Sequence, residues 1–251
     1  MHLVPFKKNK FSSAYNLNML FHKNKTYIMD NHLAAGWCWL QRINIDKQYN
    51  LLHIDRHYDL LHNHLDSWVD LIEEKGLNLS AYSIDQLVDF KSKEVNSISG
   101  VQFPLFRYDN YIPILNRIYP NLFAERIFAT HKNGEKFDEI VINKEVEIWE
   151  LPNELERLVI KQSRRWIVNL DIDYFFIPNV RNQSYQFLSD EYIISISKQL
   201  KKAMKNIEVF TIALSPEFCG KNWDPAMRVC KMITDAMGIE LDGLFGKSKF
   251  G

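Results

Sequence analysis

The sequence contains few cysteines, and none of them forms a CxxC pair. Three are present among the 251 residues, namely Cys38, Cys219 and Cys230. An odd number of cysteines without paired spacing argues against a disulfide framework and against a zinc site with cysteine ligands. This usage suits a reducing compartment, so we expect a cytoplasmic protein.

An excess of either charge is also absent. Lys plus Arg and Asp plus Glu both number 31, which gives a formal net charge of zero. A neutral balance removes the usual electrostatic argument for nucleic acid or an anionic membrane as the main partner. No apolar run approaches the roughly 18 residues that span a membrane, and the N-terminal stretch lacks the apolar segment of a signal peptide. We therefore expect neither a nucleic-acid partner nor a membrane partner.

The chain has no internal repeat, no low-complexity segment and no linker rich in Pro, Gly or Ser. Its length and its 46% hydrophobic content are sufficient for one large core. The sequence thus predicts a single α/β domain over residues 1–251.

Apolar runs typical of strands alternate with amphipathic segments typical of helices. Ser189 is expected to cap one of the helices and Asp224 another, with Gly238 just past the end of the latter. Such an order predicts a mostly parallel sheet with helices on both faces. The expected strands are 26–30, 49–55, 122–130, 139–142, 165–176 and 209–218, and the expected helices are 33–45, 83–90, 188–206 and 224–238.

Four of the expected strands end in acidic or histidine residues. In a parallel α/β sheet, ligands bind outside the carboxyl ends of the strands, so these side chains are expected to meet in one crevice. They are Asp30 and His32 after TYIM, Asp55, His57 and Asp59 after NLLHI, Asp171 and Asp173 after WIVNL, and Glu217 after FTIALSP.

Several carboxylates buried together are costly unless cations compensate them. A lone DxD is more often a cap with a solvated charge, but DxHxD, DxD and DxH at three strand ends together favour a site for two divalent ions. Alternate residues of an extended chain point to one side, which would let the DxHxD side chains converge. Carboxylate and imidazole ligands without thiolate suit Mn²⁺ and are compatible with Zn²⁺, Fe²⁺ or Co²⁺. The predicted ligands are His32, Asp55, His57, Asp59, Asp171 and Asp173.

DRHYD and LDID, each after an apolar strand, together with the earlier DNH, resemble the arginase/agmatinase superfamily. The resemblance implies a three-layer α/β/α fold of the arginase/deacetylase type and a dinuclear manganese centre. Asp55 and Asp171 would bridge the two ions. The resemblance further implies that His32 and Asp59 complete one ion, and that His57 and Asp173 complete the other.

The same resemblance implies the reaction, in which a hydroxide that bridges the ions attacks a guanidinium carbon and urea is released. Glu217, in SPEF, follows the DxD at a distance similar to that of the family's guanidinium-binding glutamate. A carboxylate at this position would pair with the guanidinium through two hydrogen bonds.

The chain departs from the superfamily where free arginine is recognised. LLHNHLDSWVDL follows DxHxD in place of a segment rich in Ser, Asn and Gly, and Tyr174-Phe175 follows DxD in place of Asp and Pro. This combination is similar to the peptide arginases of ribosomal peptide natural-product pathways, which convert arginine side chains of a precursor peptide into ornithine. The implied partner is an arginine-containing precursor peptide.

Two further assignments rest on residue type and position. A general acid has to protonate the leaving amine, and His62, His64 and His131 are all candidates. Asp30 is expected to orient a ligand from behind the metal centre. The sequence does not decide among the three histidines.

Two other functions stay open. The first is hydrolysis of a different C–N bond by the same metal centre, as in a deacetylase or an amidinohydrolase. Deacetylases of this fold generally use one zinc ion, so two bound ions would count against that reading. The second is a binding protein with a structural metal site, which would show no turnover and no open coordination position.

Overall fold

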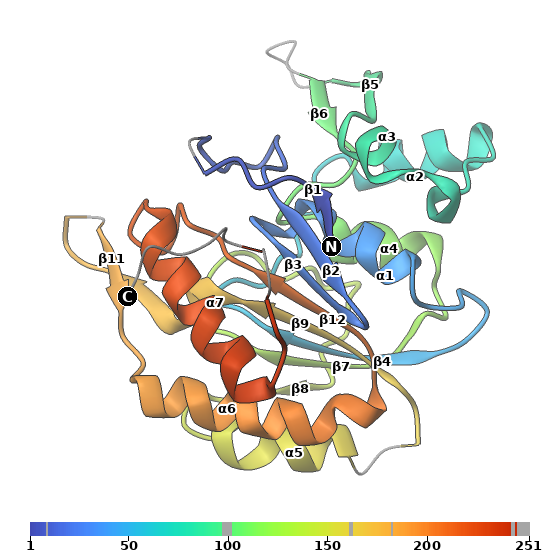
Figure 1. The fold of residues 1–251 in the computed structure, drawn as a ribbon. Coiled ribbons are helices and arrows are strands. Elements are labelled where there is room, and N and C mark those ends of the chain that lie inside the picture. The colour runs from blue at the N-terminus through green and yellow to red at the C-terminus, as the bar shows by residue number, and fades with distance from the viewer. Residues whose placement is uncertain (9, 97–101, 161–162, 182, 242–243, 245–251) are drawn as a thin grey trace.

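The computed structural model describes residues 1–8, 10–96, 102–160, 163–181, 183–241 and 244. Within this part, a central eight-stranded sheet runs through the molecule (Figure 1). In the spatial order given next, each strand from β3 across the sheet to β8 is parallel to its neighbours within that range. At the other edge, β1 and β2 are added in antiparallel fashion. The strand order is β1 (His2–Val4), β2 (Leu20–Lys23), β3 (Thr26–Met29), β12 (Ile207–Ala213), β9 (Trp166–Asp171), β4 (Tyr49–Ile54), β7 (Phe123–Ala129) and β8 (Lys144–Glu145).

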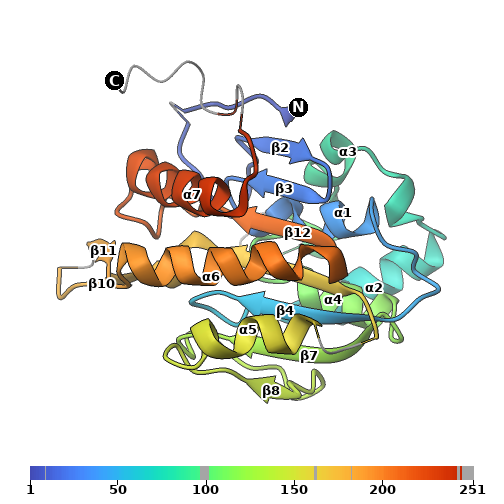
Figure 2. The same ribbon diagram turned by 60° about the horizontal axis from the view of Figure 1, so that its bottom comes forward.

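Helices cover both faces of this sheet (Figures 1 and 2). One face packs against α1 (Ala35–Leu40) and α4 (Tyr111–Ile118), and α2 (Leu65–Glu74) and α3 (Ile84–Val88) lie beyond these two helices on the same side. The other packs against α5 (Leu151–Ile160), α6 (Asp190–Ala203) and α7 (Trp223–Met237). Successive strand residues point to opposite faces, so Leu51 joins the first core and Leu52 the second. The predicted three-layer α/β/α fold with a mostly parallel sheet is confirmed.

Smaller elements complete the described part of the chain. Two antiparallel pairs lie outside the central sheet, and short 3-10 helices follow several strands. None of the described helices combines the length and the apolar character needed to cross a membrane. The pairs are β5 (Lys91–Asn96) with β6 (Gln102–Pro104) and β10 (Phe176–Pro178) with β11 (Ser184–Gln186), and the 3-10 helices are η1 (His32–Ala34), η2 (Leu79–Ala81), η3 (Ile172–Phe175) and η4 (Met204–Asn206).

The helix ends show which local signals are used. The Ser189 hydroxyl accepts the backbone N–H of Tyr192 at the start of α6, as predicted. Gly238 closes α7 with φ of 72°, a left-handed conformation that favours glycine. The predicted cap of α7 is wrong by two residues, because the side chain of Asn222 caps the helix and accepts the N–H of Asp224.

One predicted strand is absent from the described structure. Residues 139–142 form a turn and an irregular segment, and the short strand β8 begins only at Lys144. The apolar pair Val141 and Ile142 suggested a strand, but Val141 is 63% exposed and packs into no core. The predicted helix at 33–45 is also shorter, because a 3-10 turn precedes the six residues of α1.

The sheet order explains how distant residues meet. Strands β3, β12, β9 and β4 are neighbours, and all four are parallel. Their carboxyl ends lie at nearly the same height, since Ala213 pairs with both Met29 and Asp171, and Leu170 pairs with Ile54. The four segments that follow these strands therefore lie side by side, as the sequence predicted.

Candidate metal centre

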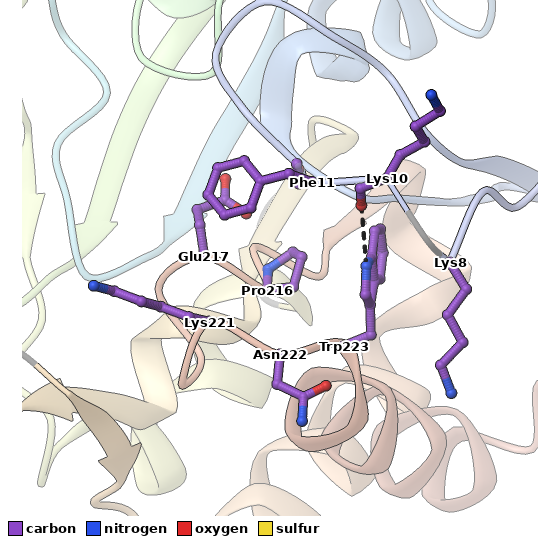
Figure 3. Close-up of a pocket in the computed structure, with 9 residues that line it drawn as sticks. Lys8, Lys10, Phe11, Pro216, Glu217, Lys221, Asn222 and Trp223 are labelled. Carbon is purple, nitrogen blue, oxygen red and sulfur yellow. Dashed lines mark hydrogen bonds between the residues drawn. The ribbon is translucent and has the colours of Figure 1, made fainter.

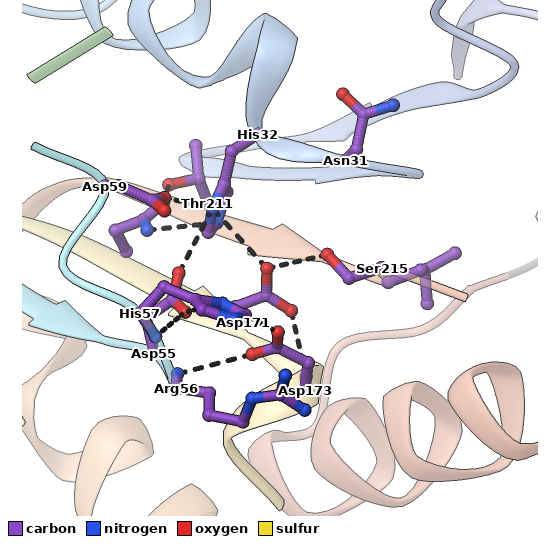
Figure 4. A network of polar contacts seen from close by, with 12 residues as sticks. Asn31, His32, Asp55, Arg56, His57, Asp59, Asp171, Asp173, Thr211 and Ser215 are labelled. Atoms are coloured by element: carbon purple, nitrogen blue, oxygen red, sulfur yellow. Dashed lines mark hydrogen bonds and ion pairs between the residues drawn. The ribbon is translucent and has the colours of Figure 1, made fainter. Parts of the chain in front are cut away.

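Asp55 lies at the middle of a buried cluster of histidines and aspartates (Figure 4). Its Oδ2 atom is 3.3 Å from Nδ1 of His32, which follows β3. Its Oδ1 atom is 3.5 Å from Nδ1 of His57, which follows the same strand as Asp55. The two oxygens of one carboxylate thus face two different imidazoles.

The other predicted ligands divide between these two imidazoles. Nδ1 of His32 is 2.9 Å from Oδ2 of Asp59 and 3.5 Å from Oδ2 of Asp171. Nδ1 of His57 is 3.1 Å from Oδ2 of Asp173. All six residues predicted from the strand ends are therefore brought together in the described structure.

These residues form overlapping groups with the spacing of metal ligands. The potential ligand atoms of His32, Asp55 and Asp171 lie within 4.8 Å of one another, as do those of Asp55, His57 and Asp173. A third group with the same spacing consists of His53, Asp55 and Asp59. Because Asp55 belongs to every one of these groups, the cluster is suited to two cations that share a carboxylate.

The DxHxD and DxD side chains do not converge through an extended chain, as the sequence suggested. Bends follow Asp55, and Asp59 adopts a left-handed backbone with φ of 52°. Asp171 caps the 3-10 helix η3 by accepting the N–H of Asp173 at 2.9 Å, and Asp55 accepts the N–H of His57 at 2.7 Å. Local turns, stabilised by the aspartates themselves, aim the side chains at one point.

Burial and mutual charge shift the pKa values within the cluster. Burial opposes a charged His32, but the carboxylates of Asp171, Asp55 and Asp59 together raise its pKa well above the usual value. Burial likewise opposes charge on His57, while Asp173 and Asp55 raise its pKa to about 11. Both imidazoles therefore hold protons that a bound cation would displace.

The cluster passes a simple test of fit for divalent ions. Oδ2 of Asp55 and Oδ2 of Asp173 are buried and form no hydrogen bond of normal geometry in the described structure, although a histidine nitrogen lies 3.3 and 3.1 Å away, respectively. Burial and the charge of Asp55 raise the pKa of Asp59 to about 7, which indicates too much negative charge for the available donors. Cations with oxygen and nitrogen ligands would satisfy these acceptors and offset that charge.

A row of polar side chains supports the cluster from one layer deeper in the sheet. Thr211 of β12, Asn169 of β9 and His53 of β4 pair in register across three neighbouring strands. Thr211 Oγ1 donates to Oδ1 of Asn169 at 2.6 Å, and Nδ2 of Asn169 lies 3.1 Å from Nδ1 of His53 and 3.0 Å from Nε2 of His32. Asn169 therefore contacts the rear nitrogen of a predicted metal ligand.

The sequence analysis missed this row and also Tyr111, whose hydroxyl donates to Oδ2 of Asp59 at 3.1 Å. For two of these residues, His53 and Asn169, the sequence spacing could have indicated a place in the cluster. His53 and Asn169 each stand two positions before a strand-end aspartate, so in a strand they point to the same face as that aspartate. Tyr111 begins α4, and nothing in its sequence context indicates the contact.

Replacing Asn169 with Ala is expected to weaken Mn²⁺ binding by about 10- to 100-fold, the usual effect of losing a group that orients a metal ligand. Isothermal titration calorimetry of the purified variant and the wild type with Mn²⁺ measures this change in affinity. Asn206→Ala is a matched control, because the Asn206 amide donates to the carbonyls of Val159 and Ile160. Equal Mn²⁺ affinities of the Asn169 variant and the wild type would show that Asn169 does not orient the His32 ring for metal binding.

Glu217 lies beside the cluster with an unusual carboxylate. Both of its oxygens are buried and lack a hydrogen-bond partner in the described structure. Burial, reinforced by the charges of Asp30 and Asp173, raises the pKa of Glu217 to about 7. It follows Ser215, whose hydroxyl donates to Oδ2 of Asp171 at 2.6 Å. The charge of Asp173, one of the predicted ligands, thus acts on this carboxylate, which has no cationic partner in the described structure.

The three histidines considered as general acids occupy different places. His62 stacks on Phe137 with ring centroids 4.3 Å apart, and the exposed His64 lies at the start of α2 with φ of 63°. Neither shows a contact with the cluster in the described structure. His131 has a buried Nε2 without a partner, and the charge of Asp173 acts on its ring, although burial lowers its pKa.

Asp30, which the sequence analysis expected to orient a ligand, has its carboxylate engaged with the N-terminal segment. Its carboxylate accepts hydrogen bonds from the Ser12 hydroxyl at 2.9 Å and from the backbone N–H groups of Asn18 and Met19 at 2.9 and 3.1 Å. These contacts fasten the N-terminal segment to β3, and burial raises the pKa of Asp30 to about 6. Its described contacts do not include a member of the metal cluster.

An aromatic ring borders the more exposed side of the cluster. Phe218 packs against His57, with ring centroids 5.2 Å apart, and against Tyr108 at 6.0 Å. The guanidinium of Arg56 lies 5.6 Å from the centre of the same ring, with its Nε and Nη1 buried and without a partner. The His57 side chain is 26% exposed, whereas the side chains of the other five predicted ligands are at most 6% exposed.

Comparisons with known proteins add little to this geometry. No protein-family model matches the chain, and no curated protein matches it. Among solved structures, it is similar to the agmatine ureohydrolase of Thermoplasma volcanium, with a TM-score of 0.44 and 12% sequence identity. The match covers 84% of this chain and 61% of that one, so the chain spans less than two thirds of that neighbour. Similarity at this level decides nothing about the site, which rests on its own geometry.

Proposed function

We propose that this chain is a manganese-dependent hydrolase of the arginase/agmatinase superfamily that converts peptidyl arginine into peptidyl ornithine and urea. The observation that carries the proposal is Asp55, whose two oxygens face separate His/Asp groups in one buried cluster. The substrate would be a ribosomally made precursor peptide.

The residues divide into roles as follows. His32 and Asp59 would hold one ion and His57 and Asp173 the other, with Asp55 and Asp171 between the two. Carboxylate and imidazole ligands without thiolate suit Mn²⁺. A pair of divalent ions would make a water nucleophilic at neutral pH.

Glu217 would bind the guanidinium group of the substrate. Its oxygens are buried without a partner, so a planar cation with paired N–H donors would satisfy both of them. Burial raises the pKa of Glu217 to about 7, and the arriving positive charge would favour the ionised carboxylate. The partner missing from Glu217 is thus supplied by the substrate.

The reaction balances as a hydrolysis. Water adds to the guanidinium carbon, the bond from this carbon to Nε of the arginine side chain breaks, and the released amine takes up a proton. We assign the proton transfer to His131, because it is the candidate on which the charge of Asp173 acts. Since burial lowers the pKa of His131, its neutral imidazole would pass on a proton that it takes from the reacting water.

Two features favour a peptide over free arginine. The segment after Asp59 has no Ser/Asn/Gly-rich stretch for the amino and carboxylate groups of the free amino acid. Aromatic side chains are exposed on the N-terminal segment, with Phe11 69% and Tyr15 46% accessible, and Tyr15 stacks on Phe103. Exposed rings of this kind suit contact with a peptide.

A urea assay with three substrates tests the proposal. The Mn²⁺-loaded protein would be incubated separately with arginine-containing peptides, with free arginine and with an acetyl-lysine peptide. The proposal predicts urea from the arginine peptides and none from free arginine. Acetate from the acetyl-lysine peptide without urea would show that a different C–N bond is the target.

A further inference from the structure

A cavity of about 230 Å³ lies between the N-terminal segment and the loop that joins β12 to α7 (Figure 3). Phe11 and Ser12 line it from one side, and Pro216 and Glu217 line it from the other. The indole of Trp223 fastens the two sides together by donating to the carbonyl of Lys10 at 3.3 Å. Glu217, whose carboxylate we assign to the guanidinium group, is thus one of the residues that line this cavity.

Positive charge surrounds this cavity. Lys8, Lys10 and Lys221 belong to its lining, and all three side chains are exposed. The ammonium group of Lys8 pairs with Asp224 at 3.0 Å. In the part of the chain that the structure describes, no ion pair is seen for Lys10 or Lys221. Two lysines of this cavity thus lack a counterion.

This arrangement is unfavourable for an arginine that arrives alone. Its guanidinium would be attracted to Glu217 but repelled by the two uncompensated ammonium groups of residues that line the cavity. A carboxylate carried next to the arginine would pair with these lysines and reverse the sign of the interaction. Complementary charge at a rim of this kind gives specificity more than affinity.

We propose, on the basis of the function proposed above, that Lys10 and Lys221 select arginines with acidic neighbours in the peptide. An exposed ion pair is worth roughly a two- to five-fold change in affinity. With both lysines engaged, we expect acidic neighbours to tighten peptide binding by about 3- to 10-fold at low salt. The preference should nearly vanish in 1 M salt, where the screening length falls to about 3 Å.

Three labelled peptides of equal length test this proposal, each with one arginine flanked on both sides by Glu, Gln or Lys. Binding to the Mn²⁺-loaded full chain would be measured by fluorescence anisotropy, and urea release would be measured in parallel. We expect the peptide flanked by Glu to bind most tightly, the peptide flanked by Gln less tightly and the peptide flanked by Lys most weakly. The K10Q/K221Q double variant should remove the order, whereas K8Q should keep it, because Lys8 is already paired with Asp224.

The outcomes separate this inference from the proposed function. Urea release with equal affinities for the three peptides would overturn the inference and leave the function standing. The predicted affinity order without urea from any peptide would overturn the function and leave the acidic preference standing. An order that survives in the double variant, or no measurable binding of any peptide, would also overturn the inference.

Discussion

Replacing Glu217 with Gln is expected to lower kcat/KM for an arginine peptide by about 10²- to 10³-fold. The amide keeps the shape of the side chain but removes the negative charge, and an unpaired buried charge costs about 3–5 kcal/mol. Glu217 is not one of the six predicted metal ligands, so the variant should bind Mn²⁺ like the wild type. Steady-state kinetics and the metal content of the same preparation measure both quantities.

The same substitution should stabilise the folded protein at alkaline pH. Burial raises the pKa of Glu217 from 4.5 to about 7, so the folded state keeps this proton over a range in which the unfolded state has lost it. The stability that this group contributes is therefore present at low pH and is lost as the pH rises through about 7. We expect E217Q to raise the free energy of unfolding at pH 8 by about 1–3 kcal/mol, with little change at pH 4, below the pKa of the unfolded state.

Urea denaturation of wild type and variant at the two pH values measures this effect. Glu135→Gln is a suitable control, because Glu135 is exposed. An E217Q variant that turns over peptide at the wild-type rate would remove Glu217 from guanidinium binding. A loss of metal in this variant would instead place its carboxylate among the ligands.

Replacing Asp55 with Asn is expected to abolish both metal binding and turnover, with a loss in rate of at least about 10³-fold. Asp55 contributes one oxygen to each half of the cluster, so the substitution removes a charged ligand from both. The N–H of His57, which Asp55 Oδ1 accepts at 2.7 Å, can still be accepted by the amide oxygen. The local turn should therefore survive while the ions are lost.

Metal analysis of the dialysed protein measures this prediction, with two Mn²⁺ per chain expected for the wild type. Asp30→Asn is a matched control, since Asp30 is also a fully buried carboxylate after a strand, but its hydrogen bonds hold the N-terminal segment. We expect that variant to keep both ions. Two ions in the Asp55 variant would contradict the shared-carboxylate arrangement.

The location of the site could be predicted from the sequence because two simple rules apply to it. Apolar runs such as WIVNL are buried strands, and ligands gather at the carboxyl ends of parallel strands. Adjacent placement of β3, β12, β9 and β4 then brings the six predicted ligand side chains together. Neither rule depends on the details of the loops.

The local geometry could not be predicted in the same way. The bend after Asp55 and the left-handed conformation of Asp59 depend on contacts that the sequence does not display. Asp30 illustrates the same limit, because its partner Ser12 comes from a segment that crosses β3 only in the folded chain. The helices α2, α4 and α5 were also not assigned, because proline and polar residues interrupt their apolar patterns, as Pro113 and Pro152 do.

The central claim is that arginine within a peptide loses its amidino group as urea. Accurate mass spectrometry of a peptide with a ¹³C-labelled guanidino carbon tests it most directly, after incubation with Mn²⁺-loaded protein and with protein treated with a chelator. We predict that the loaded protein removes CH₂N₂ together with the ¹³C label, which then appears in urea, and that the chelated protein does not. A peptide that keeps its labelled carbon in the presence of protein with two bound ions would contradict the claim.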